Sequence, residues 1–147
     1  MRANLDSNVL LYALLEPHGA KGTVALDIIN RTSGRGVIAT QALGELIWVT
    51  RRRRPDLMPG AVEMIARLRS TFTIVDTTPE LLLAATELNA RHQVPFWDAV
   101  IWKAGAAAGA GLFLSEDLQD GFKADGIRVL DPFNPANAAE LDRFLPH

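Results

Sequence analysis

Residues 112–121 read LFLSEDLQDG, a short apolar run followed at once by acidic side chains. Residues 112–114 have the composition of a strand that is buried on both faces of a parallel sheet. Glu116, Asp117 and Asp120 follow directly, although like charges this close repel one another. We expect Glu116 to be solvated. The stretch therefore predicts a central strand whose carboxyl end collects negative charge.

The same alternation of short apolar strands with helices extends along the whole chain. We expect five strands, at residues 2–5, 36–39, 72–75, 112–114 and 127–130. Helices are expected at residues 9–15, 21–31, 40–53, 59–69, 79–92 and 95–108. This order is typical of a three-layer α/β/α domain with a central parallel five-stranded sheet. The 147 residues fit a single domain, in which residues 131–147 form a C-terminal tail.

The composition excludes several classes of site. Hydrophobic residues make up 48% of the chain and charged residues 22%, which is ordinary for a globular protein. The absence of cysteine excludes disulfides, thiolate metal sites and a cysteine nucleophile, and it fits a reducing compartment. Three scattered histidines argue against a histidine zinc site. A net charge of −2 is unlike that of proteins that coat DNA. With no signal-peptide or membrane-spanning pattern, we expect a cytoplasmic protein with no membrane partner.

Two acidic residues lie just after expected strands. Asp6 comes after the first strand, and Asp117 comes after the fourth. In open parallel sheets, ligands bind at the edge formed by the carboxyl ends of the strands. We therefore expect both carboxylates at this edge, close together if the first and fourth strands are neighbours.

Two further acids lie on apolar helices. Glu45, in ALGELIWV, has mostly apolar neighbours three and four positions away, and Asp98, in PFWDAVIW, lies on a helix that is apolar nearly all round. Carboxylates that gather in one place raise one another's pKa and oppose folding, whereas a divalent cation reverses this effect. In the absence of histidine or cysteine ligands, Mg²⁺ or Mn²⁺ is the natural fit. The sequence thus predicts a shared site for a hard metal ion.

Each of these acids also has a purely structural explanation when it is considered singly. Asp6 can serve only as an N-cap, and Asp98 only as a first-turn acid favoured by the helix dipole. Asp117 and Asp120 can be turn residues, and Glu45 can pair with an arginine. The joint placement of two acids at strand ends and two on apolar helix faces favours the metal site.

Four segments of the chain, in this order, resemble the PIN-domain family, and specifically the VapC-type toxins of bacterial toxin–antitoxin pairs. The segments read LDSNVLLYA (residues 5–13), ALGELIWV (42–49), VPFWDAVIWKAGAAAGAGLFLSEDLQDG (94–121) and IRVLDPFNP (127–135). The D-S-N of the first segment and the S-E-D of the third match the family patterns D-[ST]-N and [ST]-x-D. The resemblance covers nearly the whole chain and implies a PIN-like fold with a sheet order of 3-2-1-4-5.

The resemblance also implies the residues of the site. The catalytic acids of the family fall on Asp6, Glu45, Asp98 and Asp117. These four would hold one or two Mg²⁺ or Mn²⁺ ions, with Asp120 matching an additional acid of some members. Groups that orient the carboxylates or metal-bound waters fall on Ser7, Asn8 and Ser115. Whether Glu45 and Asp120 bind metal directly is left open at this point.

The activity implied by the resemblance is that of a metal-dependent endoribonuclease, in which an activated water cleaves RNA to leave a 5′-phosphate and a 3′-hydroxyl. Weak candidates for phosphate contacts are Arg51, Arg52, Arg53, Arg54 and Lys103. The tryptophans at positions 48, 97 and 102 could stack on bases, but we expect them to pack in the core. Implied partners are an RNA substrate, a cognate antitoxin and a second copy of the chain as a homodimer.

Two other functions are weighed against this one. The first is a non-catalytic PIN-like module that binds RNA or acts as a scaffold. The second is a Mg²⁺-dependent phosphatase-like domain for phosphoryl transfer, which requires a second aspartate two residues after Asp6, where this chain has Asn8. The sequence does not identify the RNA that is cut, the cleavage site, the antitoxin, the preferred metal or the number of metal ions.

Overall fold

The structure, a computed structural model, describes residues 1–147. Its strands are β1 (Ala3–Leu5), β2 (Val37–Ala39), β3 (Thr73–Val75), β4 (Leu112–Leu114), β5 (Lys123–Ala124) and β6 (Ile127–Leu130). Its α-helices are α1 (Ser7–Leu15), α2 (Ala20–Thr32), α3 (Thr40–Arg53), α4 (Met58–Thr71), α5 (Pro79–His92), α6 (Phe96–Ala107) and α7 (Ala138–Phe144). Two short 3₁₀ turns lie at Pro55–Leu57 and Pro135–Asn137. No helix is both long and apolar enough to cross a membrane.

The strands form one sheet in the order β3-β2-β1-β4-β6-β5. The five expected strands are present and run parallel in the expected order, so β1 and β4 are neighbours. The expectation of only five strands was wrong, because β5 adds a short antiparallel edge to β6. Asp125 and Gly126 both have positive φ and form the two-residue turn of this hairpin.

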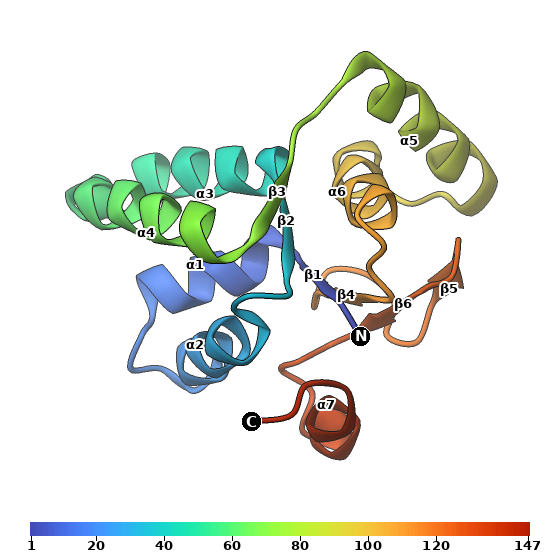
Figure 1. Ribbon diagram of the computed structural model, residues 1–147. Coiled ribbons are helices and arrows are strands. Elements are labelled where there is room, and N and C mark those ends of the chain that lie inside the picture. Colours follow the sequence, from blue (N-terminus) through green and yellow to red (C-terminus); the bar gives the residue numbers. More distant parts are fainter.

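Helices cover both faces of the sheet. Figure 1 shows α5 and α6 on one side, α1 and α2 on the other, and the α3–α4 pair projecting away from the sheet. α7 lies beside α2, where the Arg31 guanidinium donates a hydrogen bond to the carbonyl of Leu145 at 2.8 Å. The centre of the core is filled by fully buried side chains of the strands, such as Leu5, Ile38 and Phe113. These layers confirm the three-layer α/β/α architecture.

The contact between β1 and α6 determines where the site is built. The Asn4 side chain of β1 donates a hydrogen bond to the Ile101 carbonyl of α6 at 2.8 Å. Gly105 permits this approach, because a Cβ at that position would lie 2.4 Å from Asn4 Nδ2. Since α6 is antiparallel to β1, the amino end of α6, with Asp98, lies at the carboxyl end of β1, with Asp6.

Helix starts follow the sequence signals in part. Thr78 caps α5, and its hydroxyl accepts a hydrogen bond from the Leu81 amide at 3.1 Å. Thr40 does not cap α3 but is the first residue of that helix. Its hydroxyl donates to Asp76 Oδ1 at 2.9 Å, which ties the carboxyl ends of β2 and β3 together.

Candidate active site

The site begins where β1 and β4 end side by side. The two strands pair in register through Leu5 and Leu114, so the next residues, Asp6 and Ser115, leave the sheet together. The Asp6 amide donates to the Leu114 carbonyl at 3.1 Å. The Ser115 hydroxyl donates to Asp6 Oδ2 at 2.6 Å, and both side chains are fully buried. The fold therefore holds the Asp6 carboxylate in one orientation.

Asp6 also caps α1, and the first turn of that helix carries the groups that surround it. Asp6 Oδ1 accepts a hydrogen bond from the Ser7 amide at 2.8 Å. Asn8 Nδ2 lies 3.3 Å from Asp6 Oδ2, 3.2 Å from Ser115 Oγ and 3.1 Å from Asp117 Oδ2. One amide group therefore stands between the carboxylates of Asp6 and Asp117. The oxygen of the same amide, Asn8 Oδ1, is buried without a hydrogen-bond partner.

Glu45 and Asp98 reach this edge from the other elements that surround it. The Ser7 hydroxyl donates to Glu45 Oε2 at 2.5 Å, and Gln41 Nε2 donates to Glu45 Oε1 at 3.3 Å. Asp98 lies in the first turn of α6 and is partly buried. Four elements of the fold thus each bring one acid to the carboxyl edge of the sheet.

The electrostatics of these acids show that they share one environment. Burial raises the pKa of Asp6 to about 7, opposed by the Ser115 hydrogen bond and increased by repulsion from Asp98 and Asp117. Burial also raises the pKa of Asp98 to about 6, and repulsion from Glu45 and Asp117 adds to this effect with no opposing hydrogen bond. None of the four acids forms an ion pair with a basic residue.

These features fit a divalent cation, although the acidic side chains do not form a compact cluster. No three acidic or histidine side chains lie close enough together to form a ready metal site. The donors are all oxygens, their mutual repulsion has no positive partner in the protein, and Asn8 Oδ1 leaves a buried polar atom unsatisfied. The residues that could hold the ion are Asp6, Asp98 and Asp117, with Glu45 at the side.

The family of the chain is identified by its similarity to known proteins. The PIN-domain family model matches residues 4–124. The chain belongs to the PIN-domain family. None of the curated proteins is detectably similar to it in sequence.

Solved structures share the fold of this PIN domain at low sequence identity. VapC20 of Mycobacterium tuberculosis, a toxin that cleaves the sarcin–ricin loop, is 20% identical with a TM-score of 0.65, over 80% of this chain and 92% of that one. A chain of the DNA-bound VapBC of Salmonella typhimurium is 16% identical with a TM-score of 0.66, over 90% and 98%. A chain of a toxin–antitoxin complex from Klebsiella pneumoniae is 14% identical with a TM-score of 0.66, over 90% and 98%.

Two acids beside the site have other partners in this PIN domain. The carboxylate of Asp120 accepts hydrogen bonds from the Asp131 amide at 3.0 Å and from Asn137 Nδ2 at 2.8 Å, so it holds the C-terminal tail. The geometry thus engages Asp120 away from the shared group of acids. Glu116 was expected to be solvated, but it accepts a hydrogen bond from Tyr12 and pairs with the Lys21 ammonium at 2.7 Å.

The basic candidates separate into paired and free groups. Lys103 pairs with Asp125 at 2.5 Å, and Arg54 pairs with Asp56 at 2.7 Å. The three preceding arginines are exposed and form no ion pair; they are Arg51, Arg52 and Arg53. Among the basic candidates, the free positive charge is therefore at the carboxyl end of α3.

The expectation that all three tryptophans pack in the core was wrong. Trp102 is fully buried against Phe113, but Trp48 is 61% exposed and Trp97 is 52% exposed. Both exposed indoles belong to the helices that supply Glu45 and Asp98. The apolar pattern of these helices did not show which positions the rest of the fold leaves uncovered.

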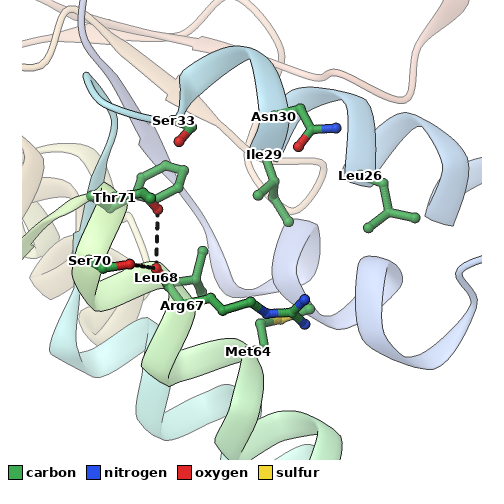
Figure 2. A pocket seen from close by; sticks show the side chains of 10 residues that line it. Leu26, Ile29, Asn30, Ser33, Met64, Arg67, Leu68, Ser70 and Thr71 are labelled. Carbon is green, nitrogen blue, oxygen red and sulfur yellow. Dashed lines mark hydrogen bonds between the residues drawn. The ribbon is translucent and has the colours of Figure 1, made fainter.

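The largest cavity of the PIN domain does not lie at the acidic edge. It lies between α2 and α4, and its mainly apolar wall includes Leu26, Ile29 and Met64 (Figure 2). Its volume is about 340 Å³. No carboxylate lines it. A smaller hollow of about 210 Å³ lies beside the acids without including them, and its wall is formed by Asn8, Leu11, Tyr12, Leu15, Glu16 and Arg53.

Proposed function

We propose that this PIN domain is a divalent-metal-dependent endoribonuclease that acts as the toxin of a toxin–antitoxin pair. One observation carries the proposal: four acids from four separate elements share the carboxyl edge of the sheet, and no positive side chain neutralises them. Membership of the PIN-domain family supports it. So does the likeness of the fold to VapC20, which cleaves the sarcin–ricin loop.

The roles of the acids follow from their contacts. Asp6, Asp98 and Asp117 would hold Mg²⁺ or Mn²⁺, which when bound lowers the pKa of a water and neutralises charge on the scissile phosphate. Ser115 and Asn8 fix the Asp6 carboxylate, so its free lone pairs are already directed before the substrate arrives. Glu45 is held by Ser7 and Gln41, and its carboxylate would orient the attacking water or accept its proton.

The products follow from attack by water on phosphorus. A bond forms between the water oxygen and phosphorus, and the bond from phosphorus to the 3′ oxygen breaks. The 5′ side of the downstream fragment keeps the phosphate, and the upstream fragment ends in a 3′-hydroxyl. No nucleophile from the protein is required, which agrees with the absence of cysteine and with a site composed of carboxylates.

The proposed partner of the toxin is an antitoxin that blocks the acidic edge. Four acids without a positive partner offer a place for a basic side chain of such a protein. The Salmonella and Klebsiella structures are toxin–antitoxin assemblies, which supports this partner. The proposal also includes a homodimer in the cytoplasm.

Cleavage of a labelled single-stranded RNA in Mg²⁺ or Mn²⁺, with and without excess EDTA, tests the function. We expect fragments with 5′-phosphate ends, which a phosphate-dependent 5′ exonuclease then degrades, and no cleavage in EDTA. Cleavage that survives excess chelator would reject the metal mechanism. RNA binding without any cleavage would instead favour the non-catalytic PIN-like module, which the loosely gathered acids also suit.

A further inference from the structure

A single stripe of side chains runs along α3 from the acidic edge to the basic end of the helix. Gln41, Glu45, Trp48 and Arg52 are spaced by four, three and four residues, which places them on one helix face. Gln41 donates to Glu45, and Glu45 accepts from Ser7 at the acidic edge. The Arg52 guanidinium lies 5.6 Å from the centre of the Trp48 ring. The stripe therefore connects an acid of the proposed site with an exposed indole and a cation.

The fold can bury an indole, so the exposure of Trp48 needs another explanation. The same protein buries Trp102 completely, yet it leaves 61% of Trp48 in contact with solvent. The Arg52 guanidinium lies over the ring, and the indole still keeps most of its surface exposed to solvent. An exposed aromatic ring beside a cation is the arrangement with which proteins bind unpaired nucleotides, since every base has a face that can stack.

The charge around Trp48 favours a polyanion as its occupant. Arg51, Arg52 and Arg53 are exposed and unpaired, although the chain as a whole has a net charge of −2. Arg53 lines a hollow whose wall also includes Asn8, and Asn8 contacts Asp6 and Asp117. One of the free cations thus shares a hollow with a residue that contacts two of the acids. A second copy of this chain docked with its two-fold axis at these arginines would set them against their own equivalents, at an electrostatic cost.

We propose that the Trp48–Arg52 stripe of α3 is a nucleotide subsite that stacks one unpaired base of an RNA strand whose neighbouring phosphate lies at the acidic edge. Arg52 and Arg53 contact the phosphates that flank this base. The subsite makes the enzyme selective for single-stranded RNA, because a base within a duplex presents no free face to an indole. This inference rests on the proposed ribonuclease function and adds a substrate-positioning role for residues that do not touch the acids.

The test compares Trp48→Ala, Trp48→Phe and Arg52→Ala with two matched controls on α4. The controls are Val62→Ala and Arg69→Ala, which remove an exposed apolar side chain and an exposed unpaired arginine outside the Trp48–Arg52 stripe. Binding of a fluorescent single-stranded RNA is measured by anisotropy in an Asp98→Asn background, so that cleavage does not consume the probe. We expect Trp48→Ala to weaken binding by about 5- to 150-fold, the range for loss of a stacked base. Trp48→Phe should keep most of the affinity, and the controls should keep all of it.

Two further measurements make the result specific. Arg52→Ala should reduce the slope of log affinity against log salt by about 0.7, the value for one phosphate contact on a single strand, whereas Arg69→Ala should leave the slope unchanged. An RNA with one abasic nucleotide, moved stepwise past the mapped cleavage site, should lose affinity at one position. At that position the abasic RNA should bind Trp48→Ala and the parent equally, because the stacking partner is already gone.

The outcomes separate this inference from the function on which it rests. An active enzyme whose RNA affinity and KM are unchanged by Trp48→Ala overturns the subsite and leaves the ribonuclease standing. A wild-type protein that cleaves no RNA in any metal overturns the function first. If Trp48→Ala converts a dimer to a monomer in sedimentation velocity without a change in RNA affinity per subunit, the face is a protein interface and the subsite is rejected.

Discussion

Glu116 and Asp117 are neighbours in the chain, yet the fold treats their charges in opposite ways. Glu116 accepts a hydrogen bond from Tyr12 and pairs with Lys21 at 2.7 Å. Asp117 Oδ2 accepts a hydrogen bond from the Asn8 amide at 3.1 Å, and the Asp117 backbone amide donates to the Ser115 hydroxyl. No cation forms an ion pair with Asp117. Of these two adjacent acids, the protein thus neutralises Glu116 with its own lysine and leaves Asp117 without a positive partner.

The same division separates two sides of the sheet edge. On the side of the C-terminal tail, Asp120 accepts hydrogen bonds from the tail, and Lys21 and Tyr12 hold Glu116. On the side of α3 and α6, burial and mutual repulsion raise the pKa of Asp6 and of Asp98. We call the side of the C-terminal tail the paired side, and it shows that this fold can compensate acids where they only support structure. We call the side of α3 and α6 the open side, and its uncompensated acids point to a positive group supplied from outside the chain.

The sharpest test of this difference compares Asp98→Asn with Glu116→Gln. We expect Asp98→Asn to reduce RNA cleavage by roughly 100-fold or more, since loss even of a group that only orients a metal ligand typically costs 10- to 100-fold. Glu116→Gln should retain activity within several fold, because its partners are Tyr12 and Lys21. Initial rates on one labelled RNA, with circular dichroism to confirm folding, decide the matter. Equal losses in both variants would remove the distinction between the two sides.

A second test uses the dependence of stability on pH in metal-free buffer. The folded-state pKa of Asp6, about 7, lies above its ordinary value of 3.8, so between these pH values the folded state binds more protons than the unfolded state. The free energy of unfolding contributed by Asp6 should therefore decrease as pH rises from about 4 to 7, by a few kcal/mol in total. Asp6→Asn should flatten this decrease, and urea unfolding at pH 4, 5.5, 7 and 8 measures it.

The control for this test is Asp120→Asn, which removes an acid from the paired side. Its absolute stability should fall with the loss of the tail contacts, but the decrease in stability that Asp6 causes between pH 4 and 7 should remain. Saturating Mn²⁺ should abolish the decrease in the wild type, because the ion binds the ionised carboxylates of the folded state. A wild-type stability that rises steadily from pH 4 to 7 without metal would contradict the uncompensated repulsion on the open side.

Local sequence signals were sufficient for much of the fold and for the position of Asp6 and Asp117 on it. Asp6 and Asp117 follow strands, and the strand-end rule alone predicts the edge on which both lie. The order of the strands came from the family resemblance. The sequence also contained a signal for β5 that the five-strand prediction missed: Asp125-Gly126 between Ala124 and Ile127 is a typical two-residue hairpin turn.

Long-range contacts explain what the sequence could not show. Glu116 looks solvated in a turn, and its cation, Lys21, is 95 residues away. The apolar neighbours of Trp48 predict burial, but whether another element covers that face depends on how α3 leaves the sheet. The unpaired state of the four acids is likewise a property of the whole fold, since three arginines follow Glu45 on the same helix and none pairs with it.

The smallest expected effect concerns the paired side alone, and it asks whether Tyr12 and Glu116 act as one unit. A double-mutant cycle of Tyr12→Phe with Glu116→Gln, followed by urea unfolding, should give a coupling energy of about 1 kcal/mol, because a hydroxyl that donates to a carboxylate is a charge-assisted hydrogen bond. The same cycle of Tyr12→Phe with Asp125→Asn should give none, since Asp125 pairs with Lys103 and not with Tyr12. If the first cycle also gives zero, Glu116 is not neutralised through Tyr12, and the contrast with Asp117 would depend on Lys21 alone.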